Sequence, residues 1–412
     1  MTDITTSPPG PATADVPEYP MPRAAGCPFD PPPGLRQVAA EAPITKVRWW
    51  DGSTPWLVTD YHDERSLLAD PRLSADTSYP QFPGLTPGYM ENHRHGRPFI
   101  RMDDPEHARL RQVVAPWFSV KRAEALRPAI QGIVDGLIDE LLAGPKPVEL
   151  VEAFALVVPS LVLCKLLGVP YDDHRFFQEN TALFNQRDAS PEQGVQAGQE
   201  LLGYMDRLVG ARLADPGDDL MSEVARRVKA GELSREEAAQ TGALLLRGGH
   251  DTTAMMIALS TLALLQNPEQ LAILRETDDA AIIAGAVEEL LRYLTIVQFG
   301  LPRVAPEDIE AGGQVIGAGE GVLVSLNIAN RNPAIFAGPD RLDICRDARG
   351  HVAFGFGVHQ CLGQNLARVE LQVVYGTLYR RIPTLKLATD LAKIPFKDNS
   401  LNYGVDELPV TW

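Results

Sequence analysis

The chain has 412 residues with a formal net charge of −16 at pH 7, and 45% of its residues are hydrophobic. This composition is typical of a globular protein with a large core, and the negative charge opposes charge-driven binding to nucleic acids or anionic membranes. Four scattered cysteines without a CxxC pair exclude a disulfide framework and a cysteine zinc site, so we expect a reducing, cytoplasmic setting.

The N-terminal part of the sequence is dominated by loops and short strands. Residues 1–33 are polar and rich in proline, which indicates a flexible arm, and they contain no apolar signal segment. Residues 44–60 hold two β-rich runs around Asp51-Gly52, a pattern typical of a hairpin. Residues 79–99 are rich in proline and glycine without a period, which predicts an irregular lid over a binding site.

The middle of the chain is mostly helical. Its longest periodic segment begins near Ser234 and ends at Asn267, about 32 residues or roughly 48 Å, and predicts a buried central helix. After Leu301 the pattern changes to short β-like runs. No repeat or linker divides residues 34–412, so we expect one mainly α domain with a minor β region. The most apolar stretch is interrupted by proline and is too short to span a membrane.

A glycine-rich loop surrounds Cys361 in the segment HVAFGFGVHQCLGQNLARVEL, residues 351–371. Glycine allows tight turns and a close approach of the backbone to the sulfur. The helical pattern that resumes at Leu362 places Cys361 at a helix start, where free N–H groups favour a thiolate. A thiolate here would be a nucleophile or a metal ligand. A structural cysteine is the alternative, and a hydrolase would need a histidine aimed at the sulfur, which His359 at this spacing rarely provides.

Two adjacent glycines interrupt the long helical pattern in RGGHDTT, residues 247–253. Gly248 lies one turn before Thr252, so the two predict a notch beside a hydroxyl that can bond the preceding turn. A notch for helix packing is the alternative. Arg247 either points into a pocket, where it could bind a carboxylate or polyol substrate, or pairs within the helix bundle. The side of the helix on which His250 lies stays open.

Two other helical motifs carry charged pairs. Glu289 and Arg292 in EELLRY are three residues apart and, taken alone, indicate an exposed ion pair. His107 and Arg111 in DDPEHARLR share one helix face and, taken alone, indicate a solvated basic edge.

Together these motifs resemble the cytochrome P450 superfamily, in its soluble bacterial type. The segment Phe354-x-x-Gly357-x-His359-x-Cys361-x-Gly363 resembles the haem-binding signature of that family. The resemblance implies the triangular, mostly α cytochrome P450 fold, and haem b whose iron has Cys361 as its proximal ligand. The residues that it assigns to haem binding are His107, Arg111, Arg303, Phe354, Gly355, His359, Cys361 and Gly363.

The resemblance also implies roles for the remaining motifs. Asp251 and Thr252 match the acid–alcohol pair that delivers protons in the distal oxygen pocket. The histidines and arginines of the haem set become partners of the two haem propionates. Glu289 and Arg292 become part of a buried structural network that locks onto Arg341.

The implied activity is that of a haem-thiolate monooxygenase. It would insert one atom of O₂ into a bulky, mostly apolar organic substrate, with electrons from NAD(P)H through a ferredoxin reductase and a ferredoxin. We expect a cytoplasmic monomer without nucleic-acid or membrane partners. The ferredoxin would dock beside Cys361, where the candidate cations are Arg109, Arg346, Arg349 and Arg368.

Two other haem functions are alternatives to the monooxygenase activity. A peroxygenase would take its oxygen from H₂O₂, but such relatives tend to lack the acid–alcohol pair that is present here. A haem-based sensor would need an output domain, for which the sequence offers no segment.

Overall fold

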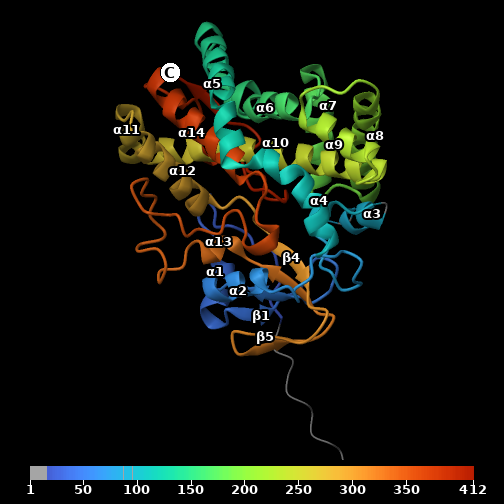
Figure 1. Ribbon diagram of the computed structural model, residues 1–412. Helices are drawn as coiled ribbons and strands as arrows, with labels where there is room; N and C mark the ends of the chain where they lie inside the picture. Colours follow the sequence, from blue (N-terminus) through green and yellow to red (C-terminus); the bar gives the residue numbers. More distant parts are fainter. Residues whose placement is uncertain (1–15, 87, 95) are drawn as a thin grey trace, which may run out of the picture.

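The computed structural model describes residues 16–86, 88–94 and 96–412 as a layer of helices above a smaller part that contains most of the sheet (Figure 1). The helices are α1 (Pro33–Glu41), α2 (Tyr61–Ala69), α3 (Tyr89–Arg94), α4 (Glu106–Val114), α5 (Val120–Ala143), α6 (Val157–Leu167), α7 (His174–Asn185), α8 (Pro191–Ala214), α9 (Leu220–Lys229), α10 (Arg235–Gln266), α11 (Pro268–Glu276), α12 (Ala280–Leu294), α13 (Leu326–Ala329) and α14 (Gln364–Arg381). The strands are β1 (Ile44–Lys46), β2 (Trp56–Val58), β3 (Val148–Glu149), β4 (Leu301–Val304), β5 (Ile309–Ala311), β6 (Gln314–Ile316), β7 (Gly321–Val324), β8 (Lys386–Leu387) and β9 (Pro409–Thr411). The expectation of a mainly α fold with a minor β region is confirmed.

The largest sheet among the described residues joins segments from distant parts of the sequence in the order β1-β2-β7-β4. β1 pairs antiparallel with β2, with Ile44 opposite Val58, which confirms the predicted hairpin. β2 runs parallel to β7, and β7 runs antiparallel to β4. This sheet therefore anchors the N-terminal region beside β4, the strand that carries Arg303.

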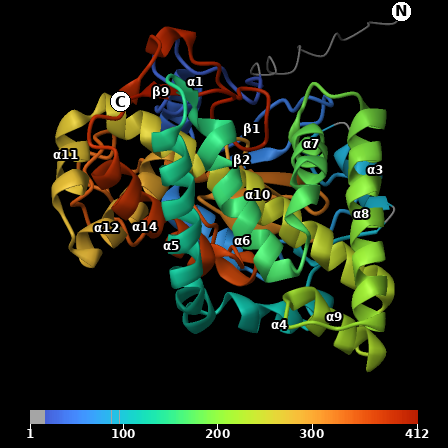
Figure 2. The same cartoon turned by 90° about the horizontal axis from the view of Figure 1, so that it is seen from above.

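The central helix α10 has the predicted bounds. The Ser234 side chain accepts a hydrogen bond from the Glu237 N–H, and Glu237 accepts one from the Ser234 N–H at 2.7 Å, so the two form a capping box. Figure 2 shows α10 crossing the middle of the helical layer. All side chains from Thr253 to Leu264 are buried, which confirms the prediction of a buried spine. No helix of the described residues is long and apolar enough to cross a membrane.

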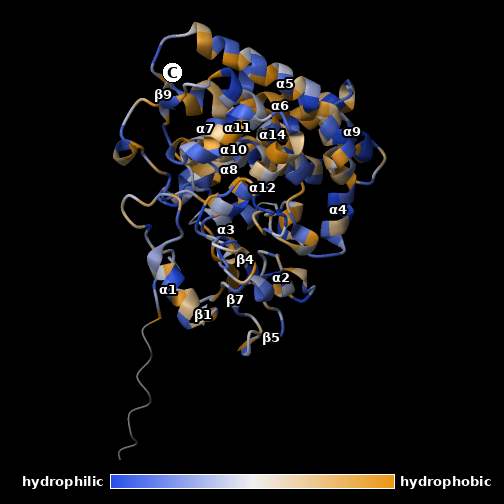
Figure 3. Cartoon of the chain, turned by 90° about the vertical axis from the view of Figure 1, so that its left-hand side faces the viewer, coloured by the Kyte–Doolittle hydropathy of each residue, from blue (hydrophilic) through white to orange (hydrophobic). Residues whose placement is uncertain are grey.

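The outer helices bury one face each. In α5, Ile130, Val134 and Ile138 follow the four-residue spacing of a helix and are almost fully buried. Figure 3 shows α5 as alternating hydrophobic and hydrophilic segments, as expected of a helix with one face on the core.

The prediction of a flexible arm over residues 1–33 is wrong for residues 16–32. Residues 1–15 lie outside the described part of the chain, but residues 16–32 are packed on the molecule. The ring of Tyr19 is stacked on Trp49 with centroids 5.7 Å apart, and the backbone N–H of Tyr19 donates to the Arg48 carbonyl at 2.9 Å. Burial of a large aromatic side chain outweighs the lack of regular structure that its proline-rich surroundings indicate.

The expectation of an irregular segment over residues 79–99 is also corrected, because α3 lies inside it. This helix is docked on α8, where Asn92 Nδ2 donates to the Gly194 carbonyl at 2.9 Å. A Cβ on Gly88 would lie 3.1 Å from the Pro191 carbonyl oxygen. Glycine at position 88 therefore allows the two backbones to approach closely. A glycine-rich composition alone does not distinguish such a packed segment from an irregular loop.

Candidate active site

The loop before α14 is held in one shape by its glycines. Gly355 and Gly357 have φ values of +70° and +73°, which glycine adopts without strain. A Cβ on Gly357 would lie 2.1 Å from the Leu68 carbonyl oxygen, so only glycine fits against the end of α2. The Cys361 N–H donates to the Phe354 carbonyl at 2.9 Å and closes the loop.

Cys361 precedes α14 rather than starting it. The cap residue is Gly363 and the first helical residue is Gln364, so the expectation that Cys361 stands at the first helical position is wrong by a few residues. The electrostatic argument still holds, because the backbone N–H groups of Gly363 and Gln364 both bond the sulfur. Burial raises the pKa of the Cys361 thiol, while these amides and the Arg111 guanidinium lower it. A metal ion deprotonates a coordinating thiol outright, so this donor set fits an iron ligand.

One face of α10 is accessible in the middle of an otherwise buried helix. Leu244, Gly248 and Thr252 follow each other at four-residue spacing, and none of the three is buried. A Cβ on Gly248 would meet no atom within 4 Å, so the notch is open space and not a packing contact. The Thr252 hydroxyl donates to the Gly248 carbonyl at 2.7 Å, as the spacing predicts.

Asp251 lies beside this face and is held by two amides. It is buried, and its Oδ2 accepts hydrogen bonds from Asn402 Nδ2 at 2.9 Å and from Asn185 Nδ2 at 3.3 Å. Sequence reasoning missed both asparagines, because they lie far from Asp251 along the chain and belong to no motif. The structure therefore adds a clamp on the acid that directly precedes Thr252 in the sequence.

Five basic side chains form a second part of the site, which we call the cation cluster: Arg101, His107, Arg111, Arg303 and His359. The rings of His107 and His359 lie 4.1 Å apart, and His107 Nδ1 is 3.0 Å from Asp104 Oδ1. Arg111 Nη2 donates to the Gln360 carbonyl at 2.6 Å, and Arg303 Nη1 donates to the Pro302 carbonyl at 2.8 Å. Residues from α4, β4 and the cysteine loop thus meet as predicted.

Arg101 is the member that sequence reasoning missed. It is buried, its guanidinium lies over the rings of Phe82 and Tyr89, and it acts electrostatically on Arg303 and His359. The only sequence signal was its position shortly before the His107 motif.

The arginines of the cation cluster lack counter-charge. Among the described residues, no carboxylate forms an ion pair with Arg101, Arg111 or Arg303, and His107 Nε2 and His359 Nδ1 are buried without a hydrogen-bond partner. Burial lowers the pKa of Arg303 to about 9, and burial together with the neighbouring Arg303 lowers the pKa of His359 to about 2. Because an unpaired buried charge is costly, the arrangement fits a ligand that brings carboxylates, as haem propionates would.

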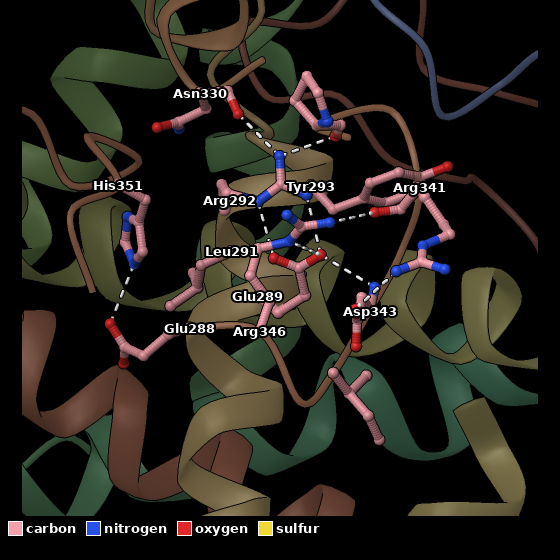
Figure 4. A network of polar contacts seen from close by, with 12 residues as sticks. Glu288, Glu289, Leu291, Arg292, Tyr293, Asn330, Arg341, Asp343, Arg346 and His351 are labelled. Atoms are coloured by element: carbon pink, nitrogen blue, oxygen red, sulfur yellow. Dashed lines mark hydrogen bonds and ion pairs between the residues drawn. The ribbon is translucent and has the colours of Figure 1, made fainter. Parts of the chain in front are cut away.

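A different buried cluster, the Glu289 network, lies on α12 and consists of Glu289, Arg292 and Arg346 (Figure 4). Arg292 donates to both oxygens of Glu289 at 2.7 and 2.8 Å, and both side chains are fully buried. Arg346 Nε donates to Glu289 Oε1 at 3.2 Å. The predicted exposed pair is therefore wrong and the predicted buried network is right.

The expected third member, Arg341, is not in this network. It is 77% exposed and pairs with Asp343 at 3.0 Å (Figure 4). The loop after Gly338 instead directs the Arg346 side chain toward Glu289. Arg346 also donates a hydrogen bond to the Arg341 carbonyl at 3.2 Å. Arg346 is accordingly removed from the candidate ferredoxin contacts.

The two residues left open on α10 lie on different sides. His250 is almost fully buried against the Phe177 ring of α7, and burial lowers its pKa to about 4, so the imidazole is neutral near pH 7. Arg247 lines a pocket between α3, α8 and α10, with its guanidinium carbon 4.0 Å from the centre of the Phe184 ring. The pocket interpretation of Arg247 is the one that this geometry supports.

Comparison with known proteins agrees with this site. The family model described as Cytochrome P450 matches residues 211–383. The chain is 54% identical over 414 residues to Cytochrome P450 GfsF of Streptomyces halstedii and 45% identical over 415 residues to Vitamin D3 dihydroxylase of Streptomyces griseolus, in both cases over 100% of each chain.

The fold agrees as well. The crystal structure of the mycinamicin VIII C21 methyl hydroxylase MycCI from Micromonospora griseorubida, bound to mycinamicin VIII, is 39% identical and aligns with a TM-score of 0.91. The alignment covers 96% of this chain and 100% of that one. Family membership implies haem iron as the cofactor. The chain therefore belongs to the cytochrome P450 family and is a P450 monooxygenase.

Proposed function

We propose that this P450 monooxygenase holds haem b between α10 and the loop of Cys361, with the cation cluster on the haem propionates. The observation that carries the proposal is that the buried Arg101 and Arg303 and the half-buried Arg111 lie together without a carboxylate partner, next to a cysteine whose sulfur receives two backbone N–H groups. Phe354, Gly355 and Gly363 shape the same loop. A Cβ on Gly363 would meet no atom within 4 Å, which leaves room for a flat ligand.

The haem, once bound, supplies the O₂ chemistry, with electron density from the Cys361 sulfur favouring cleavage of the O–O bond. Side chains of the protein hold and orient the groups that deliver protons. Thr252 donates its own hydroxyl hydrogen to the Gly248 carbonyl, so its oxygen is oriented as an acceptor on the open face of α10. The Asp251 carboxyl lies one residue away and can pass a proton toward that face, while Asn185 and Asn402 hold it in place.

We infer a bulky, mostly apolar substrate. Two relatives support this class by their names, since one acts on vitamin D3 and the other was solved with mycinamicin VIII. The open stripe of Leu244, Gly248 and Thr252 offers room where the reacting carbon would lie. α3, docked on α8, would cover this space as the lid.

We further propose a ferredoxin, reduced from NAD(P)H by its reductase, as the electron donor to a cytoplasmic monomer. The free cysteines of the described chain are consistent with a reducing compartment. The candidate docking cations differ in exposure and pairing. Arg349 has an 82% exposed side chain that pairs with the exposed Asp347 at 2.6 Å. Arg109 is less exposed and is bonded to Glu237, and Arg368 is largely occupied by Glu288 at 2.7 Å. Reversing the charge of Arg349 or Arg109 should slow reduction about threefold or more at low salt, and a salt-independent or unchanged rate would contradict this docking face.

Turnover of the holoprotein with NADPH, a ferredoxin and its reductase tests the proposed function. We expect product from a macrolide or secosteroid panel to form with O₂ consumption, and Thr252→Ala to consume NADPH with about tenfold less product per electron pair. Thr253→Ala, one residue further on the buried side of α10, is the control. Turnover by H₂O₂ that Thr252→Ala leaves unchanged would favour the peroxygenase instead.

A further inference from the structure

Arg247 is a half-buried cation that neither the cation cluster nor the proton-delivery pair uses. It lies on α10 directly before Gly248, at the edge of the accessible face. Its guanidinium stacks on Phe184 of α7 at 4.0 Å from the ring centre. Its side chain lines the pocket between α3 and α8, while the next residue, Gly248, belongs to the open face of α10.

Arg247 has no anionic partner. Among the described residues, no carboxylate pairs with it and no acceptor takes a hydrogen bond from it; its guanidinium stacks on the Phe184 ring. Burial lowers the pKa of Arg247 to about 10, and Arg101 nearby acts in the same direction. The guanidinium therefore stays charged near pH 7 in a place that penalises charge.

Other unsatisfied polar atoms face the same region. The Tyr89 hydroxyl on α3 is buried without a hydrogen-bond partner, and Tyr89 is within electrostatic reach of Arg247 and Arg101. His93, one turn later on α3, lines the pocket with Arg247 and has a buried Nδ1 without a partner. The pocket has a volume of about 40 Å³, which suits a group of carboxylate size and not a whole bulky substrate.

We propose that Arg247 binds a carboxylate on the substrate, so that the natural substrate is an apolar carboxylic acid whose acid group sits between α3 and α10. This proposal rests on the proposed function and deepens it by naming the substrate class. The acid group would take the guanidinium donors that Phe184 leaves free, with the Tyr89 hydroxyl as a further donor. The apolar body would then extend past Gly248 toward Thr252.

Matched pairs of probes test the proposal on the haem-loaded protein. The probes are dodecanoic acid with dodecanamide, and deoxycholic acid with its primary amide, each titrated by the Soret shift and by calorimetry. We expect at least one acid to bind about tenfold or more tightly than its amide in the wild-type protein. Arg247→Gln should remove that preference by weakening the acid alone, and Arg247→Lys should keep most of it.

The controls separate this proposal from the proposed function. Arg207→Gln removes an exposed arginine that lies over the Tyr204 ring on α8, and it should leave the acid preference unchanged. The spectrum of the reduced carbon monoxide complex is recorded first for each protein. A thiolate-type spectrum without acid preference in either pair, or a preference that Arg247→Gln leaves intact, overturns the carboxylate proposal alone. A wild-type protein without that spectrum overturns the proposed function.

Discussion

The Glu289 network and the cation cluster both bury arginines, but only the first contains its own counter-charge. Glu289 bonds Arg292 and Arg346, and the remaining Arg292 donors reach the carbonyls of Asn330 and Pro339 at 2.8 and 2.9 Å. In the cation cluster, Arg303 has a single backbone acceptor. A complete network needs nothing further to be stable, whereas an incomplete one indicates a bound anion.

This difference distinguishes buried charges that stabilise the fold from buried charges that bind a ligand. Substitution in the Glu289 network should damage the folded protein whether or not haem is present. Substitution in the cation cluster should damage haem retention and spare the apoprotein.

The largest effect is expected from Glu289→Gln. It leaves Arg292 and Arg346 buried without a carboxylate, which costs about 3–5 kcal/mol of unfolding free energy. Urea denaturation of the apoprotein measures it. A loss below about 1 kcal/mol would show that the network is not the structural element we describe.

Arg303→Met should weaken haem binding without destabilising the apoprotein. Removing an unpaired buried cation should leave the unfolding free energy of the apoprotein unchanged or raise it, since the desolvation cost disappears. Haem should dissociate about 10–100-fold faster, as expected for the loss of a charge-assisted hydrogen bond. Transfer of haem to apomyoglobin gives the rate, and an unchanged rate would remove Arg303 from the haem site.

Glu370 on α14 is a buried carboxyl of a third kind, because its Oε2 has no hydrogen-bond partner. Burial raises the pKa of Glu370 to about 8 from its ordinary value of 4.5. The folded protein thus holds a proton that the unfolded chain releases above pH 4.5, and stability falls as pH rises from there toward 8. Glu370→Gln should stabilise the protein at pH 7 by about 1–3 kcal/mol and flatten this slope. Equal slopes in wild type and variant would contradict it.

The smallest effect is expected at Arg341. Arg341→Met removes an exposed pair and should change the unfolding free energy by less than about 0.5 kcal/mol. Arg346→Met, a few residues away, should cost about 1.5–3 kcal/mol, because it removes one charged donor from Glu289 Oε1. Similar losses of unfolding free energy in the two variants would contradict the finding that Arg346, and not Arg341, contacts Glu289.

Sequence patterns predicted those parts of the molecule that local chemistry decides. The bounds of α10 follow from a capping box and a stop at Asn267, and the cysteine loop follows from glycines that no other residue can replace. The proximity of His107 to His359 came only from the resemblance to a known family.

Partners that depend on the path of the chain were missed. Arg341 and Arg346 are equally plausible on spacing, and only the turn between them decides which one reaches Glu289. Asn402 lies 151 residues from Asp251, so no local pattern could connect them. Residues that complete a site through tertiary contacts carry no periodic signal of their own.

The absorption spectrum of the dithionite-reduced, haem-loaded protein with and without carbon monoxide tests whether Cys361 ligates the haem iron. We predict the red-shifted Soret band that characterises thiolate-ligated haem, and its loss in Cys361→His with haem still bound. A wild-type band typical of histidine or neutral-thiol ligation would contradict the assignment of Cys361 as the iron ligand.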